Sequence, residues 1–203
     1  YMELAAHYVR PPLAALIITH GVSGSGKSYY AAQLAERLGA IQLRSDVERK
    51  RLHGYAAAAD TRSGLEAGIY SANASTRTYE RLATLARTVI EAGYPVIVDA
   101  TFLQYPLREQ FRQLSASLDV PFVLLHCEAD RDTLCTRIRS RQAAGGDPSE
   151  AGIEVLDAQL ASREPLMPLE MAAVLLVDSG MDTPIKDLHG QLVERIQTMA
   201  AGE

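Results

Sequence analysis

The chain has 203 residues, of which 47% are hydrophobic and 22% are charged; these values fit one globular domain and exclude an intrinsically disordered chain. No apolar run approaches the roughly 18 residues that a membrane-crossing helix needs, which excludes a membrane-spanning protein. The 20 basic and 25 acidic residues give a net charge of −5, which argues against broad, non-specific coating of nucleic acid. Two cysteines, Cys127 and Cys135, are too few for a disulfide framework, so we expect a reducing, cytoplasmic setting.

The first twelve residues differ in pattern from the rest. Residues 1–8 have the pattern of one or two helical turns, and Pro11-Pro12 cannot continue a helix. The segment lacks the features of a signal peptide. Two interpretations stay open: a disordered leader, or a linker that ends a preceding module, with the two prolines as a stiff spacer. Residues 13–203 are predicted to form one domain.

Beyond Pro12, short segments rich in Val, Ile and Leu alternate with longer amphipathic ones. The short segments are apolar on both faces, which is typical of buried parallel strands. This alternation predicts right-handed crossovers and a three-layer α/β sandwich. The expected strands are Leu13–Thr19, Ala40–Arg44, Pro95–Ala100, Val120–Cys127 and Ala173–Asp178. The expected helices span about residues 27–38, 72–92, 105–118, 130–143, 150–163 and 185–200.

Between the first expected strand and helix stands the segment Gly21-Val22-Ser23-Gly24-Ser25-Gly26-Lys27-Ser28. It fits the phosphate-loop pattern G-x-x-x-x-G-K-[S/T] at every fixed position. The chain has three lysines against seventeen arginines, and one of the three lies here. We expect Lys27 to reach the β- and γ-phosphates of a nucleotide and the Ser28 hydroxyl to ligate Mg²⁺. The backbone expected to cradle the phosphates belongs to Gly21, Ser23, Gly24, Ser25 and Gly26.

The second expected strand is followed directly by Ser45-Asp46. Ligands gather at the carboxyl ends of parallel strands, so Asp46 should face the same crevice as the phosphate loop. There it could accept the proton of an attacking hydroxyl. The alternative is that Asp46 caps the helix that follows. Arg49 lies one turn further on and either holds an anionic part of the phosphoryl acceptor or faces solvent.

The third expected strand ends at Asp99, which is followed by Ala100-Thr101. An acidic residue at this place holds Mg²⁺ in phosphate-loop enzymes, directly or through water. Two alternatives stay open for Asp99: a hydrogen bond to the acceptor, or a cap on the turn that follows. Thr101 could support either the metal or the acceptor.

The helix expected after the fourth strand is rich in arginine. Arg137 and Arg141 are four residues apart and share a face of that helix. A turn of small residues at 142–148 then precedes the next helix. We therefore predict a closing lid at about residues 131–150, in which these two arginines neutralise charge as the γ-phosphoryl group moves. The alternative is a solvated basic face. Residues 54–71 show little periodicity and are a place where an acceptor pocket could be built.

Four segments together resemble a known family. Their order and residues resemble the zeta-toxin-like predicted kinases of the phosphate-loop superfamily, in particular the ATP-binding kinase module that follows an aminoglycoside-phosphotransferase-like domain in bifunctional bacterial proteins. The resemblance implies a nucleoside-monophosphate-kinase-like fold, with a five-stranded, mainly parallel sheet in the order 2-3-1-4-5. It also favours residues 1–12 as the junction with such a fused domain. The segments are G-V-S-G-S-G-K-S, R-S-D-V-E-R-K-R-L, G-Y-P-V-I-V-D-A-T-F and R-I-R-S-R-Q-A-A-G-G-D-P-S-E-A.

The same segments are similar to the 5′-hydroxyl polynucleotide kinases. In that family the aspartate after the second strand is the base, and the arginine three residues later contacts substrate phosphate; these roles would fall on Asp46 and Arg49. Val47 stands where that family often has a second acid. Gluconate-type kinases share the phosphate loop, a lid arginine and a glutamine in the helix after the lid, which Gln159 matches loosely.

We therefore predict a kinase that uses ATP and Mg²⁺ and transfers the γ-phosphoryl group to a hydroxyl of a small molecule. The first alternative is a nucleic-acid 5′-hydroxyl kinase, which would need a basic groove leading to Asp46. The second is a regulatory module that uses ATP as a switch for a fused partner and needs no acceptor pocket beside Asp46. The residues that could begin a basic groove are Arg44, Arg49, Lys50 and Arg51.

Overall fold

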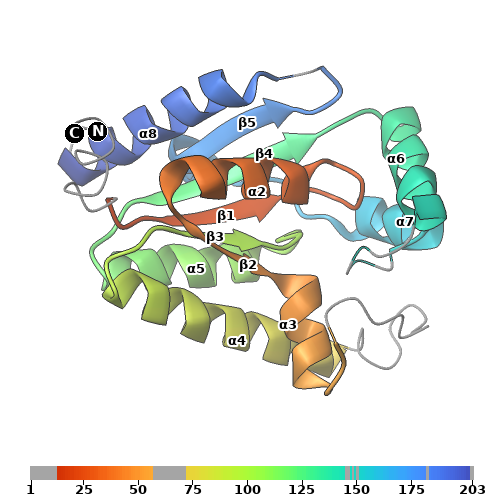
Figure 1. Ribbon diagram of the computed structural model, residues 1–203, viewed down its shortest axis with the longest axis horizontal. Helices are drawn as coiled ribbons and strands as arrows, with labels where there is room; N and C mark the ends of the chain where they lie inside the picture. Colours follow the sequence, from red (N-terminus) through yellow and green to blue (C-terminus); the bar gives the residue numbers. More distant parts are fainter. Residues whose placement is uncertain are drawn as a thin grey trace, which may run out of the picture.

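A five-stranded sheet forms the centre of the computed structural model (Figure 1). The strands stand in the order β2-β3-β1-β4-β5, and every neighbouring pair is parallel. The predicted fold class, strand order and strand direction are confirmed. The strands are β1 Leu16–His20, β2 Ile41–Arg44, β3 Val96–Asp99, β4 Phe122–Glu128 and β5 Val174–Asp178. The structure describes residues 13–56, 72–144, 147, 149, 151–181 and 183–201; the expectations for residues 1–12 and 57–71 lie outside them.

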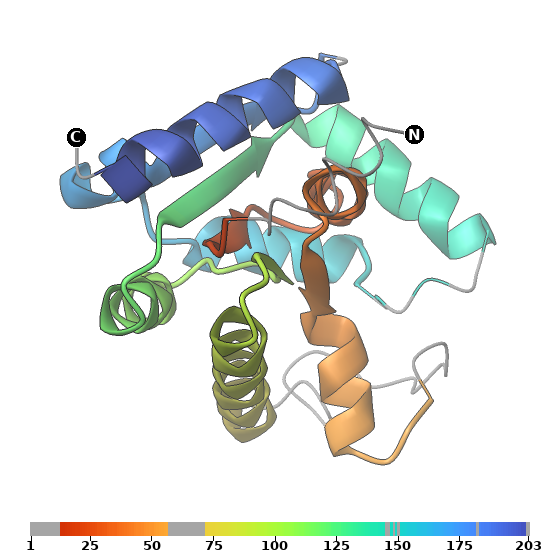
Figure 2. The same ribbon diagram turned by 60° about the vertical axis from the view of Figure 1, so that its left-hand side comes forward.

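Helices cover both faces of the sheet (Figures 1 and 2). Successive side chains of a strand point to opposite faces, and β1 shows this clearly. Ile17 packs in the cluster that includes α2 and α8, whereas Leu16 and Ile18 pack in the cluster that includes α4 and α5. Both faces of the central strand are therefore buried, as its apolar sequence predicts. The helices of these two layers are α2 Lys27–Leu38, α8 Ile185–Ala201, α4 Ala72–Glu91 and α5 Tyr105–Ser117.

The expectation that all five strands are apolar and buried on both faces is wrong for the two edge strands. In β2, Ile41 is 43% exposed, and in β5, Leu176 is 54% exposed. On β5, Leu175 and Val177 are buried on the face that α8 covers. On the other face of β5, Val174 is partly buried against the cluster that includes α5, whereas Leu176 is left exposed. An edge strand has a neighbour on one side only, so the helical layers need not extend over it.

Three helices lie at the carboxyl ends of the strands, where parallel sheets place their sites. Helix α3 (Ser45–Leu52) follows β2 directly. A six-residue 3-10 segment, η2 (Pro168–Ala173), is not one of the three, because it leads into the amino end of β5. The region of the predicted lid contains α6 (Arg131–Ala144), and α7 (Ile153–Ser162) follows it. These two helices pack together on the phosphate loop through an apolar cluster. Its buried members are Val22, Leu103, Leu134, Ile138 and Leu156.

Two histidines face each other at the carboxyl ends of β1 and β4. His20 and His126 are register partners, and their Nδ1 atoms lie 2.7 Å apart. His126 Nε2 lies 3.4 Å from the Glu128 carboxylate. His20 is 4% exposed; burial, with the charge that a protonated His126 would add, lowers the pKa of His20 to about 3. Burial also lowers the pKa of His126. Both imidazoles are therefore neutral in the folded protein near pH 7.

We expect this pair to make the fold less stable in acid. The unfolded chain takes up a proton on His20 near the ordinary pKa of 6.5, and the folded chain only near 3. Between these values the unfolded state binds more protons, so stability falls as pH falls, by at most about 1.4 kcal/mol per pH unit from this group. Urea unfolding of wild type and His20→Gln between pH 7 and pH 4 should give a shallower pH dependence for the variant. His53→Gln, at an exposed histidine, should retain the wild-type slope; equal slopes in all three proteins would contradict the assignment.

Candidate functional site

The phosphate-loop sequence forms the turn between β1 and α2, and two of its glycines have no room for a side chain. Gly24 has φ +83°, and a Cβ there would lie 2.8 Å from the carbonyl oxygen of Leu134. A Cβ on Gly21 would lie 2.3 Å from the carbonyl oxygen of Cys127. Real Cβ atoms do not approach other atoms as closely as these two distances. The loop can therefore come this close to α6 and β4 only at positions that carry glycine. The loop is thereby held at the start of α2.

Lys27 is buried within this loop, with 8% exposure. Its Nζ donates to the Val22 carbonyl at 2.7 Å and to Ser25 Oγ at 3.5 Å. Burial lowers the pKa of the ammonium; the Asp99 and Asp46 carboxylates oppose this, and the Arg141 guanidinium adds to it. A charge removed from water in this way gains strongly from an anion brought next to it.

Asp99, at the end of β3, is 4% exposed. Burial raises the pKa of its carboxyl, and a hydrogen bond from the Ser28 hydroxyl and the charges of Lys27 and Arg44 oppose the shift. Gln42 Nε2 donates to Asp99 Oδ2 at 3.1 Å, and Arg44 Nε lies 3.6 Å from the same oxygen. A hydroxyl and a carboxylate thus meet beside the lysine, and hard oxygen donors of this kind fit Mg²⁺.

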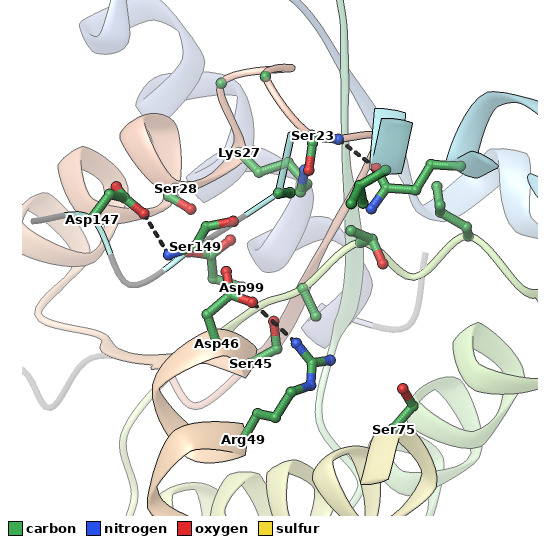
Figure 3. A pocket seen from close by; sticks show the side chains of 18 of the residues that line it. Ser23, Lys27, Ser28, Ser45, Asp46, Arg49, Ser75, Asp99, Asp147 and Ser149 are labelled. Carbon is green, nitrogen blue, oxygen red and sulfur yellow. Dashed lines mark hydrogen bonds and ion pairs between the residues drawn. The ribbon is translucent and has the colours of Figure 1, made fainter. Parts of the chain in front are cut away.

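Asp46 lies in the first turn of α3, and the N-cap of that helix is Arg44. The alternative that Asp46 is the helix cap is therefore wrong. Arg49 Nη1 donates to Asp46 Oδ1 at 3.1 Å, and the Asp46 side chain remains 24% exposed. Figure 3 shows Asp46 and Asp99, from different elements, pointing into the same space.

One cavity of about 530 Å³ joins these groups (Figure 3). Every predicted site residue lines it except Gly21 and Ser25. Ser25 is fully buried, and its backbone N–H donates to the Val22 carbonyl at 3.2 Å. Ser25 therefore stabilises the loop through a hydrogen bond within it. The lining predicted residues are Ser23, Gly24, Gly26, Lys27, Ser28, Asp46, Arg49, Asp99, Thr101, Arg137 and Arg141.

The remaining walls come from residues that the sequence did not single out. They belong to α3, α4, the start of α5 and α7, and they combine hydroxyl groups with apolar side chains. Gln159, which had only a loose family match, lines the cavity, and its Oε1 accepts the Ser23 backbone N–H at 2.7 Å. Apolar periodicity predicts that a helical position faces inward, but it does not separate a cavity wall from the core. The other lining residues include Ser45, Ser75, Tyr79, Leu103, Gln104, Leu107, Val155 and Ser162.

Arg137 and Arg141, although they share a face of α6, have different contacts. Arg137 Nη1 donates to the Gly24 carbonyl at 3.3 Å and to Ser179 Oγ at 2.9 Å, and its Nη2 donates to the Ser179 carbonyl. Arg137 therefore joins the phosphate loop to the segment that follows β5. Arg141 Nη2 donates to the Ala151 carbonyl at 2.6 Å.

The charge of the Arg141 guanidinium contributes to the lowered pKa of Lys27. The other two arginines of this helix lie away from the cavity. Arg131 pairs with Asp157 on α7, and both side chains are more than half exposed. Arg139 is exposed. Of the four, Arg137 and Arg141 are the two that line the cavity.

Within the described part of the chain, no helix is both long enough and apolar enough to cross a membrane. The same residues contain no group of three or more His, Cys, Asp and Glu side chains that could hold a metal ion. Cys127 and Cys135 are free thiols.

Residues 16–166 match a protein-family model described as an AAA domain. Relatives among curated proteins include uncharacterized proteins of Mycobacterium tuberculosis and Mycobacterium bovis. Each is 30% identical over 164 residues, which cover 81% of this chain and 32% of the relative. The chain thus spans about a third of the length of these relatives.

Solved structures with the same fold include several kinases. A candidate kinase of Chloroflexus aurantiacus gives a TM-score of 0.70 at 21% identity, covering 92% of this chain and 98% of that one. A sugar kinase of Janibacter sp. HTCC2649 gives 0.65 at 22% identity, covering 93% and 97%. The APS kinase of Mycobacterium tuberculosis, solved with AMPPNP and APS, gives 0.61 at 19% identity, covering 92% and 99%. These likenesses establish that the chain has the fold of phosphate-loop kinases.

We expect Lys27→Met to weaken ADP binding by at least about tenfold, because it removes a charged donor beside the phosphates. The variant should still fold but be less stable than wild type, since the buried Asp99 carboxylate loses the opposite charge of Lys27. Isothermal titration with ADP and Mg²⁺, together with urea unfolding, measures both effects. Lys186→Met, at an exposed lysine of α8, is the matched control. Unchanged ADP affinity in the Lys27 variant would contradict the assignment of the loop.

Proposed function

Because the chain belongs to the AAA-domain family of kinase-like phosphate-loop proteins, we propose that it is a kinase that transfers the γ-phosphoryl group of ATP to a hydroxyl of a small molecule. Residues 13–203 form the kinase unit. The observation that carries the proposal is that Lys27 and Ser28 share one cavity with Asp46. A nucleotide switch needs a phosphate site, but it has no need of a second compartment lined by a carboxylate and hydroxyl groups. The cavity therefore supports a kinase over a switch.

The phosphate loop and α2 are the nucleotide end of this cavity. Backbone N–H groups and the N-terminus of α2 face the phosphates, and Lys27 supplies a charge. Ser28 and Asp99 would hold Mg²⁺ together with oxygens of the nucleotide phosphates. The phosphate oxygens are needed because two protein oxygen donors are too few to bind the ion alone. When bound, the ion would neutralise charge that develops on the phosphoryl oxygens. The AMPPNP named with the APS kinase structure supports ATP as the donor.

Asp46 is the proposed general base. Arg49 donates to its Oδ1, which orients the carboxylate and leaves the other oxygen for the acceptor hydroxyl. As the acceptor oxygen bonds to the γ-phosphorus, the bond from that phosphorus to the β,γ-bridging oxygen breaks, ADP leaves, and the hydroxyl proton passes to Asp46. Arg141, whose charge already reaches Lys27, is placed to stabilise the moving phosphoryl group.

The cations near Asp46 support a small acceptor over a polynucleotide. Arg44 lies beside the Asp99 carboxylate, and Arg49 pairs with Asp46. Arg51 pairs with an acid of its own helix, and Lys50 is 1% exposed. A groove that binds a nucleic-acid backbone needs accessible positive charge; of these four residues only Arg51, with 65% side-chain exposure, is largely accessible.

The finer family assignment is also a proposal. We propose that the chain belongs with the zeta-toxin-like kinases and forms the kinase module of a longer cytoplasmic protein with a phosphotransferase-like domain. The support is the set of four motifs and the length of the mycobacterial relatives, of which the matched region is 32%. The sugar kinase among the structural neighbours supports a polyhydroxylated small acceptor.

The proposal is tested by phosphoryl transfer from labelled ATP to a panel of sugars, nucleosides, aminoglycosides and 5′-hydroxyl oligonucleotides. We expect a small hydroxyl compound to be labelled, and Asp46→Asn to lower this transfer by about 10²–10⁴-fold, because the amide cannot take up the proton. The ADP affinity of the variant should stay within about twofold of wild type, because the loop contacts are unchanged.

Asp187→Asn, at an exposed acid of α8, is the matched control and should transfer as wild type does. Near-normal transfer by Asp46→Asn would remove Asp46 as the base. A loss of ADP affinity that depends on Mg²⁺ would move Asp46 to the metal. Labelling of oligonucleotides alone would favour the polynucleotide kinase, and labelling of nothing by a protein that binds ATP would favour the switch.

We expect substitutions of Arg137 and Arg141, the two cavity-lining arginines of α6, to have different kinetic effects. Arg141→Gln should lower turnover by at least about tenfold with little change in ADP affinity, since its contact would strengthen in the transition state. Arg137→Gln should weaken ADP binding, because it releases α6 from Gly24 and Ser179. Arg139→Gln, exposed on the same helix, is the control. Turnover is measured with the acceptor from the panel; identical kinetics for all three variants would leave α6 as a solvated basic face.

A further inference from the structure

Arg108, in α5, is the largest fully buried side chain among the described residues, with 0% exposure, and no motif of the sequence points to it. Its Nε and one Nη2 hydrogen face the Glu170 carboxylate at 2.7 and 3.0 Å. Its Nη1 donates to the carbonyls of Phe102 and Leu103, both at 3.2 Å. Its Nη2 also donates to the Pro165 carbonyl at 2.9 Å. These five bonds occupy all five N–H donors of the guanidinium.

Two of those carbonyls belong to a strained turn directly after β3. Phe102 has φ +47°, in a region that residues with bulky side chains rarely adopt. Its ring is fully buried and meets the rings of Tyr79 and Phe111 edge-on at 5.2 and 4.9 Å. The Tyr79 hydroxyl accepts the Phe102 N–H at 3.4 Å and lies 3.5 Å from Thr101 Oγ1. Such a conformation persists only where the surrounding contacts hold it.

The strained turn is also a wall of the cavity. Thr101, Leu103 and Gln104 line it, and the Thr101 carbonyl accepts the Gly21 N–H of the phosphate loop at 3.1 Å. The same turn is joined to the end of α7, because Gln104 Nε2 donates to the Ser162 carbonyl at 2.8 Å and the Glu164 N–H donates to the Leu103 carbonyl at 2.9 Å. A shift of this turn would therefore move two neighbouring walls of the cavity together.

We propose that Arg108, paired with Glu170, is a positioning residue that holds the 101–104 turn in its strained form and thereby shapes the acceptor side of the cavity. This inference rests on the proposed kinase function. Arg108 does not line the cavity, so it acts through the carbonyls of Phe102 and Leu103. The nucleotide is held by other groups, namely the loop backbone and Lys27. Loss of Arg108 should therefore impair use of the acceptor and spare the nucleotide.

The double variant Arg108→Met/Glu170→Leu separates positioning from stability. Replacing both partners of a buried ion pair with apolar side chains leaves no unpaired charge, so the fold is retained. The three carbonyls nevertheless lose their donor. We expect amide hydrogen exchange across residues 101–104 to rise at least about tenfold and acceptor kcat/KM to fall about 10- to 100-fold. ADP affinity should stay within about twofold of wild type.

The control makes the same chemical change at a partly exposed ion pair of the same helix, Arg112→Met/Glu109→Leu, whose side chains are 42% and 20% exposed and whose paired atoms lie 2.7 Å apart. It should match wild type in exchange, acceptor kinetics and ADP affinity. Should the buried double variant not fold, Arg108→Lys is measured in its place. The lysine keeps a positive charge facing Glu170, but one ammonium cannot supply the planar fork of the guanidinium to the backbone carbonyls, so the same split is expected.

Wild-type exchange of the turn, or wild-type acceptor kinetics, in a folded Arg108 variant would overturn the proposal. Equal losses of ADP affinity and acceptor kcat/KM would overturn it as well, because they would mark a general structural role. The exchange measurement needs no acceptor. If wild-type protein labels no member of the panel, the kinase proposal fails, and exchange alone still decides whether Arg108 holds the turn.

Discussion

A buried ammonium beside a buried carboxylate is the interaction on which the site depends. Lys27 is 8% exposed and Asp99 is 4% exposed. Burial shifts the two pKa values toward neutral forms, the lysine downward and the aspartate upward, and the opposite charge of each resists the shift of the other. Neither charge would be tolerated there alone. Lys27 begins α2, which follows β1, and Asp99 ends β3. The pair therefore exists because β1 and β3 are adjacent and parallel, so the strand order is a condition of the chemistry.

A buried ion pair, Arg108 with Glu170, lies behind the turn that follows β3. Buried pairs of this kind add little net stability, because the loss of hydration offsets most of their attraction. Their effect is on geometry: five directed bonds from one planar group leave its neighbours few alternative arrangements. The Arg108–Glu170 pair fixes the turn after β3 against η2.

The features predicted from the sequence are those whose cause is local. The phosphate loop could be found because backbone geometry demands glycine at fixed spacings, as at Gly24, and the strands could be found because central strands need apolar residues on both faces. The buried Arg108 could not be found, since an arginine in an amphipathic helix is typical of a solvated face. Its burial depends on Glu170, 62 residues further along the chain. The exposed side of β5, with Leu176, was missed for a related reason: it depends on where the helical layer ends.

The arrangement of α6 bears on how charge is stabilised during transfer. Leu134 and Ile138 are 3% and 0% exposed and pack with Val22 of the phosphate loop. Swinging the whole helix away would expose both, at a cost of about 1.5–3 kcal/mol for each side chain, and would also break the bonds of Arg137 to Gly24 and Ser179. Arg141 meanwhile already lies close enough to lower the pKa of Lys27. Charge stabilisation by α6 would then need no large movement of the helix, because its cations are positioned in advance by the same apolar contacts that hold the loop.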